Sequence, residues 1–125
     1  MGQIAIISEN IIFFKHLRTF LNRKMPECSI LQFSLFPYIK EKIDEGIFDL
    51  IVVDGIISGV GSFEIINYLR LEKKISSPIC LFSDVRTDHF KAKAYESGVN
   101  YYYEKPFDPH VVTNDIVSSL LQIAI

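Results

Sequence analysis

Short apolar runs alternate along this chain with segments in which apolar residues recur every three or four positions. A continuous apolar run of strand length is typical of a strand covered on both faces, and the longer period is typical of an amphipathic helix. The runs that predict strands are Ile4 to Ile7, Ser29 to Phe33, Leu50 to Val53, Ile79 to Phe82 and Asn100 to Tyr103. This alternation predicts a parallel sheet with helices on its faces.

The segments that follow these runs predict five helices, because they show helical spacing or recognisable start and stop residues. The marker positions are Phe13, Leu17, Phe20 and Leu21 in the first, Ile39 and Ile43 in the second, Ile65, Ile66 and Leu69 in the third, Thr87 to Glu96 in the fourth, and Val112, Ile116, Val117 and Leu120 in the last. Ser62 is the predicted N-cap of the third helix. Asp108 followed by Pro109 is a favoured start for the last helix, which we expect to run to about Leu121.

Polar residues follow the predicted strands at their carboxyl ends. In a five-stranded, doubly wound parallel sheet of order 2-1-3-4-5, the loops at this edge meet at a topological switch point. Glu9, Asp54, Ser83 and Lys105 would then converge there. Two neighbouring carboxylates suggest an oxygen-ligated cation such as Mg²⁺, while a lysine and a hydroxyl can neutralise and bind a transferred group. The set suits phosphoryl transfer to a carboxylate.

Each of these residues also has an ordinary structural interpretation. Asp54 followed by Gly55 suits a turn, and Glu9 suits the first turn of a helix. Ser83 suits an N-cap and Lys105 an exposed surface position. The tyrosines at 101–103 are good strand formers on a half-exposed edge strand. The functional interpretation therefore depends on whether these residues come together.

Composition narrows the class of protein. The 125 residues are 49% hydrophobic and 22% charged, which suits one folded domain over residues 1–125. Thirteen basic and 15 acidic residues give a net charge of −2 without a Lys/Arg run, so we expect no direct binding to nucleic acid. The apolar runs are too short to span a membrane, and no basic leader precedes the first one, so we expect a cytoplasmic protein.

The cysteines and histidines show no spacing that predicts a metal site or a disulfide framework. Cys28 and Cys80 are expected to be reduced thiols. His16, His89 and His110 fall on separate predicted helices or their starts, and we expect them on the surface.

Two other classes of site with carboxylate or phosphate chemistry are disfavoured. An FMN-binding protein of the same strand order would have a Ser/Thr/Gly-rich loop after the first strand, and the segment 8–12 is not one. A phosphatase of the haloacid dehalogenase type would carry a second acid two residues after its nucleophile, where this chain has Ile56. Dinucleotide-binding and nucleophile-elbow motifs do not occur either.

Four segments occur in a characteristic order: an apolar run ending at Ser8 and Glu9, a run from Phe48 to Asp54, a run from Pro78 to Ser83, and the stretch from Tyr102 to Phe107. In order and spacing they resemble the receiver domain of bacterial two-component response regulators, over essentially the whole chain. The resemblance implies a flavodoxin-like (βα)5 receiver fold. It also implies a signalling switch rather than a conventional enzyme, one that at most catalyses its own phosphorylation and dephosphorylation.

The resemblance implies a role for each matching residue. Asp54 would accept the phosphoryl group, and Glu9, Asp54 and the backbone carbonyl of Ile56 would bind Mg²⁺. Ser83 and Lys105 would bind the phosphoryl group, and Tyr102 would be the aromatic residue that moves inward with Ser83 on activation.

A further implied feature is a cis peptide bond between Lys105 and Pro106. The phosphoryl donor would be a histidine kinase or a phosphotransfer protein. The output would be an unidentified protein bound at the face of the fourth helix, fifth strand and fifth helix. We expect a monomer or weak dimer without membrane attachment.

Several positions depart from the family pattern. Ser8 stands where the first of two adjacent acids is usual, so Mg²⁺ should bind weakly. Ser58 replaces a usual proline and Ser62 a usual glycine, with Gly59 and Gly61 nearby. These departures leave an alternative open, namely a pseudo-receiver that binds its partner without being phosphorylated.

Overall fold

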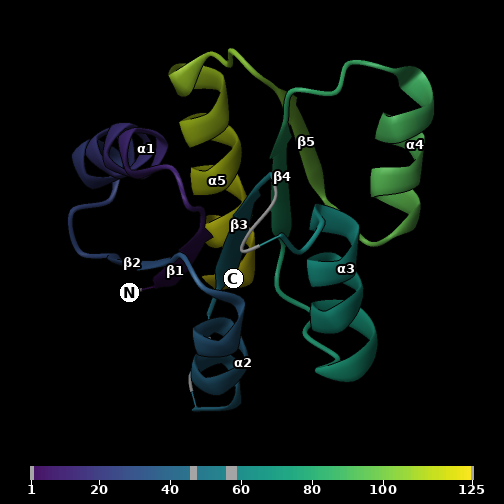
Figure 1. The fold of residues 1–125 in the computed structure, drawn as a ribbon. Helices are drawn as coiled ribbons and strands as arrows, with labels where there is room; N and C mark the ends of the chain where they lie inside the picture. Colours follow the sequence, from purple (N-terminus) through teal and green to yellow (C-terminus); the bar gives the residue numbers. More distant parts are fainter. Residues whose placement is uncertain (1, 46–47, 56–58, 125) are drawn as a thin grey trace.

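A five-stranded parallel sheet lies at the centre of the molecule, with strand order β2-β1-β3-β4-β5 (Figure 1). The computed structural model of the protein describes residues 2–45, 48–55 and 59–124. The strands are β1 (Gln3–Ile7), β2 (Ser29–Phe33), β3 (Leu50–Asp54), β4 (Ile79–Ser83) and β5 (Tyr101–Glu104). Each predicted strand is confirmed to within one residue at either end. The predicted strand order is confirmed as well.

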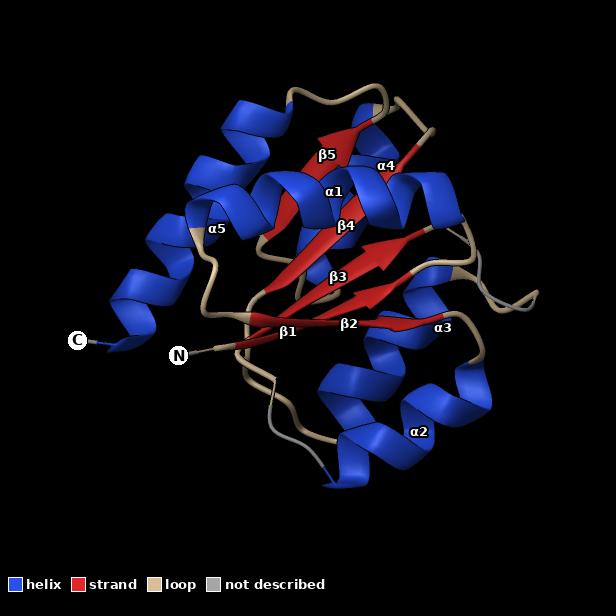
Figure 2. Ribbon diagram, turned by 90° about the vertical axis from the view of Figure 1, so that its left-hand side faces the viewer, coloured by secondary structure: helices blue, strands red, loops and turns tan. Residues whose placement is uncertain are grey.

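Helices cover both faces of this sheet. They are α1 (Ile11–Lys24), α2 (Phe36–Glu45), α3 (Ser62–Asn67), which continues as the π-helical turn η1 (Tyr68–Glu72), α4 (Asp88–Glu96) and α5 (Pro109–Ala124). Figure 2 shows α1 in front of the sheet and α4 behind it, with α2 and α3 toward the bottom of the view. Two apolar clusters correspond to these layers, one formed with α1 and α5 and the other with α2, α3 and α4.

The central strands are buried as their continuous apolar sequences predict. Every residue of β3 and β4 is buried, as are the last four residues of β1. Cys80 lies in β4 and is inaccessible, and both cysteines are free thiols. Polar groups placed at the ends of these strands are therefore held by a rigid, water-free scaffold.

Side chains at the helix starts explain where the helices begin. Asn10 caps α1 by accepting hydrogen bonds from the backbone N–H groups of Ile12 and Phe13, at 3.0 and 3.1 Å. The carboxylate of Asp108 accepts from the N–H of His110 at 2.9 Å, which confirms the predicted start of α5.

The predicted N-cap of the third helix was wrong, and the last helix ends slightly later than predicted. Gly61, in an extended conformation, is the N-cap of α3, and Ser62 is the first helical residue. The helix therefore starts without a side-chain cap. Helix α5 continues past Leu121 to Ala124 because no proline or glycine interrupts it.

Arg70 joins two loops at the edge of the sheet opposite the carboxyl ends of the strands. Its guanidinium donates to the carbonyl of Gly98 through Nε and Nη2, at 3.0 and 2.8 Å, and to the carbonyl of Ile75 at 2.6 Å. Nη2 also donates to the side-chain oxygen of Asn100 at 2.9 Å. Gly98 has φ +105°, and a Cβ atom there would lie 2.9 Å from Arg70 Nε.

Replacing Gly98 by alanine is expected to lower the free energy of unfolding by about 2 to 4 kcal/mol, because backbone strain and a clash act together. The clash cannot relax cheaply, since Arg70 is fixed by its own hydrogen bonds. Gly59→Ala is the matched control, because Gly59 also has positive φ (+76°) but open space around it. Urea denaturation of both variants measures the difference. Equal losses of unfolding free energy in the two variants would show that the expected clash with Arg70 does not lower stability.

Candidate functional site

Asp54 lies at the carboxyl end of the central strand β3. Its side chain is almost fully buried, at 4% exposure. Gly55 follows with φ +66°, and its N–H donates to the carbonyl of Phe82 on β4 at 3.2 Å. The chain therefore turns away immediately after Asp54 and leaves the carboxylate at the edge of the sheet. A buried carboxylate needs compensating partners, because desolvation strongly disfavours an isolated charge.

Two side chains from other strands supply these partners. The Ser8 hydroxyl, at the end of the neighbouring strand β1, donates to Asp54 Oδ2 at 2.7 Å. The Lys105 ammonium, just after β5, forms an ion pair with Asp54 Oδ1. The Lys105 side chain keeps 24% of its surface exposed, so the pair lies at the boundary between core and solvent. Three residues from distant parts of the sequence thus form one contact network.

Ser8 is held rigidly in the position from which it reaches Asp54. It is completely buried, and its backbone N–H donates to the carbonyl of Phe33 at 3.0 Å. Its own carbonyl accepts from the side-chain amide of Gln32 at 3.1 Å. Its hydroxyl oxygen also accepts from the N–H of Asn10 at 3.0 Å, which directs the hydroxyl hydrogen toward the carboxylate. Ser8, which replaces an acid of the family pattern, is therefore held as a hydrogen-bond donor to Asp54.

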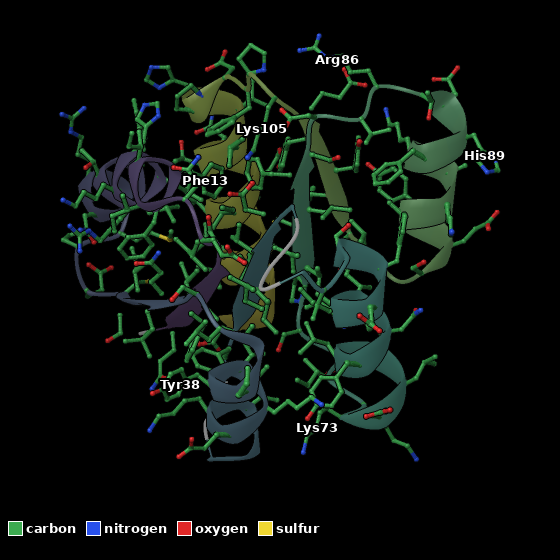
Figure 3. The ribbon with its side chains drawn as sticks, in the orientation of Figure 1. Phe13, Tyr38, Lys73, Arg86, His89 and Lys105 are labelled. Atoms are coloured by element: carbon green, nitrogen blue, oxygen red, sulfur yellow. The ribbon has the colours of Figure 1, made fainter. Side chains whose placement is uncertain are left out.

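Lys105 is anchored through its backbone to the adjacent strand and loop. Its N–H donates to the carbonyl of Ser83 at 3.0 Å, and its carbonyl accepts from the guanidinium of Arg86. The Lys105–Pro106 peptide bond is cis. The ammonium also lies over the ring of Phe13, 4.8 Å from the ring centroid, and the two side chains lie close together in Figure 3.

Ser83 and Tyr102 are connected through the loop that follows β4. Ser83 is buried, and its hydroxyl accepts from the N–H of Val85 at 3.1 Å. The Tyr102 hydroxyl donates to the carbonyl of the same Val85 at 2.5 Å. Burial raises the pKa of the Tyr102 hydroxyl, while a hydrogen bond with the Ser83 side chain acts in the opposite direction. Tyr102 is buried, with 8% of its surface exposed.

Removing the Tyr102 hydroxyl should loosen this loop. Tyr102→Phe is expected to lower the free energy of unfolding by about 1 kcal/mol, because the bond to the Val85 carbonyl is lost. Faster hydrogen exchange at the Val85 amide should accompany the loss, since the loop would be held at fewer points. Tyr95→Phe is the control, because Tyr95 is an exposed tyrosine on α4. Unchanged exchange at Val85 would contradict this account of the loop.

Of the two other residues predicted to hold a metal ion, the structure describes only Glu9. Glu9 follows Ser8 and is exposed, and Ile56 lies outside the described residues. Among the residues that the structure describes, no three or more His, Cys, Asp or Glu side chains come together in a way that could hold a metal ion. The donors at this edge are a carboxylate and a hydroxyl, oxygen ligands that suit Mg²⁺ when water completes its shell. They fit a weakly bound, largely hydrated ion.

Solved structures share this architecture over nearly the whole chain. A two-component response regulator from Clostridium difficile superposes with a TM-score of 0.87 at 22% identity, covering 98% of both chains. The fold is that of response-regulator receiver domains. The beryllofluoride-activated DrrB receiver domain (TM-score 0.83, 21% identity) covers 96% of this chain and 97% of its own. The signal receiver domain of a DNA-binding response regulator from Colwellia psychrerythraea (TM-score 0.86, 17% identity) covers 94% and 97%.

Sequence comparison adds no closer relative, because no family model and no curated protein matches this chain. Within the described residues, every helix is too short or too polar to cross a bilayer. The three histidines are exposed, as predicted.

Three contributors to this site were not predicted from the sequence. Phe13 was interpreted as a core residue alone, and Arg86 and Gln32 were not singled out. The one available signal was position, because Arg86 lies three residues after Ser83 and Gln32 lies in the strand beside Ser8. Neither position shows where a long side chain points.

Proposed function

We propose that this protein is a signalling receiver that accepts a phosphoryl group on Asp54 and changes a protein-binding surface in response. One observation carries the proposal. A buried aspartate at the end of β3 is ion-paired with Lys105. The backbone N–H of Lys105 is hydrogen-bonded to the carbonyl of Ser83 at the end of β4. A carboxylate, a fixed cation and a hydroxyl at one edge of the sheet suit phosphoryl transfer.

The chemistry assigns one task to each side chain. An oxygen of Asp54 attacks phosphorus, a P–O bond forms, and the bond between phosphorus and the donor atom breaks with its electron pair leaving on the donor. Lys105 stabilises the negative charge of the transferred group, because an ammonium in a partly desolvated site acts more strongly than in water. Ser83 donates its hydroxyl hydrogen to a phosphoryl oxygen. To reach that oxygen the Ser83 side chain would turn, which would weaken its hydrogen bond with the Val85 amide. The loop before α4 would change as a result.

Mg²⁺ is the cofactor that we propose for this site. Asp54 and Glu9 would supply its protein carboxylates, and the backbone carbonyl of Ile56 a further ligand. When bound, the ion would neutralise charge on the phosphoryl oxygens. With Ser8 in the position of an acid, we expect binding to be weak.

The proposed donor is a histidine kinase or a phosphotransfer protein, and the output is a protein bound at the face of α4, β5 and α5. A groove of about 380 Å³ lies on this face, with Lys91, Tyr102 and Val111 among its lining residues. Tyr102 therefore links the groove to the loop that Ser83 holds. The protein would act as a switch rather than as a conventional enzyme.

A second function is favoured by the bond between Ser8 and Asp54. At 2.7 Å this hydrogen bond occupies the carboxylate oxygen opposite the one paired with Lys105, so both oxygens already have partners. A pseudo-receiver would need no more than this arrangement. It would use the same groove constitutively, without phosphorylation.

Beryllofluoride, a phosphoryl mimic, separates the two functions. The ¹⁵N-labelled protein is titrated with beryllofluoride and Mg²⁺ while amide signals are followed by NMR, with Mg²⁺ alone as control. A switch should show saturable shifts at Ser83, Val85 and Tyr102 that require both components. A pseudo-receiver should show none at millimolar concentrations, and that result would exclude phosphorylation as the signal.

A further inference from the structure

Lys105 is unusually constrained for a lysine that retains solvent exposure. Its backbone is fixed on both sides, because Ser83 accepts from its N–H and Arg86 donates to its carbonyl. The flexible part is the four-carbon side chain, whose rotamer freedom in lysine amounts to about 2 kcal/mol. The ion pair with Asp54 restricts that freedom at the tip, but the Lys105 side chain keeps 24% of its surface exposed, so water still competes for it. A second contact would restrict the ammonium further.

The ring of Phe13 makes that second contact. The ammonium lies 4.8 Å from its centroid, within the range of a cation–π interaction. Phe13 is 7% exposed, and its ring packs edge to face against Phe82 at 5.0 Å and Phe107 at 5.8 Å between centroids. These neighbours fix the plane of the ring. The ring therefore presents a rigid surface to the Lys105 side chain.

We propose that Phe13 is a positioning residue that holds the Lys105 ammonium beside Asp54 through its aromatic face. The effect of Phe13 on phosphoryl transfer rests on the proposed function. The contact between Phe13 and Lys105 is present in the unphosphorylated protein. Attraction to the ring does not depend on the charge of Asp54. Lys105 would thus stay in place while the carboxylate becomes an acyl phosphate and its charge distribution changes.

The first test needs no phosphorylation and no change at Phe13. In the wild-type protein, the ε-methylene protons of Lys105 should resonate upfield of those of other lysines, because they lie over an aromatic ring. Asp54→Asn removes the ionic partner. If Phe13 holds the side chain, the upfield shift should remain in this variant. Loss of the shift on removing the Asp54 charge would overturn the proposal, because Asp54 alone would then hold Lys105.

The second test removes the ring. Phe13→Leu should abolish the upfield shift and slow labelling by acetyl phosphate about three- to tenfold, as expected for losing one partly buried cation–π contact. The matched control is Phe48→Leu, because Phe48 is equally buried, at 6% exposure, and packs edge to face with Phe33 in the other layer. Comparable slowing in both folded variants would show a general stability effect and contradict the proposal.

The two tests keep this inference separate from the proposed function. If the wild-type protein is not labelled at all, the proposed function fails, yet the ε-methylene shift still decides whether Phe13 holds Lys105. If labelling occurs and the shift is absent, the positioning role fails and the receiver function stands.

Discussion

Asp54→Asn is expected to abolish phosphoryl labelling by acetyl phosphate completely. The amide oxygen of asparagine has the shape of a carboxylate oxygen but carries no negative charge, so it is a very weak nucleophile. The amide can still accept the hydrogen bond from Ser8, which should preserve the local fold. Intact-mass spectrometry measures the result directly. The wild-type protein should gain one phosphoryl group that is lost on treatment with base or hydroxylamine.

Asp84→Asn is the matched control, because Asp84 is an exposed aspartate directly after Ser83 at the same edge of the sheet. It should be labelled as fast as the wild type. Labelling that survives in Asp54→Asn would place the acceptor on another residue and remove the basis of the proposed function.

The backbone of this fold could be predicted because the relevant information is local. The runs that became β1, β3 and β4 are apolar without interruption, and such runs occur where helices cover both faces of a strand. Parallel pairing then brings the strand ends to one edge, which is why Asp54 and Lys105 were expected to be neighbours although 50 positions separate them in the sequence. Helix boundaries were less predictable, because Gly61 and Ser62 are both acceptable caps.

Side-chain contacts within the site could not be predicted in the same way. Phe13 lies on the core side of α1, and helical spacing accounts for its burial without reference to Lys105. Whether its ring faces an ammonium depends on the packing of Phe82 and Phe107, which come from other elements. The sequence likewise marked Ser8 as a missing acid. The donors around Ser8, from Gln32 and Asn10, became visible only in three dimensions.

The second large effect is expected when Ser8 is replaced by aspartate. Ser8 is fully buried and 2.7 Å from Asp54 Oδ2, so the variant places two carboxylates in direct contact out of water. Repulsion and desolvation should lower the free energy of unfolding by about 2 to 4 kcal/mol without metal. Mg²⁺ should restore about 2.7 kcal/mol at a hundredfold excess over its Kd, because it binds the folded state. Thermal melting across a Mg²⁺ titration measures both changes.

Ser8→Asn provides the control that isolates charge, because asparagine matches aspartate in size. This variant should lose only the stability that the larger side chain costs, and Mg²⁺ should not restore it. The wild-type protein should respond to Mg²⁺ weakly, since Ser8 contributes a hydroxyl where Ser8→Asp contributes a charge. A wild-type response as strong as that of Ser8→Asp would refute the argument that Ser8 weakens the site. If Mg²⁺ instead speeds labelling only in Ser8→Asp, the lack of an acid at position 8 is the feature that keeps the natural site from being phosphorylated.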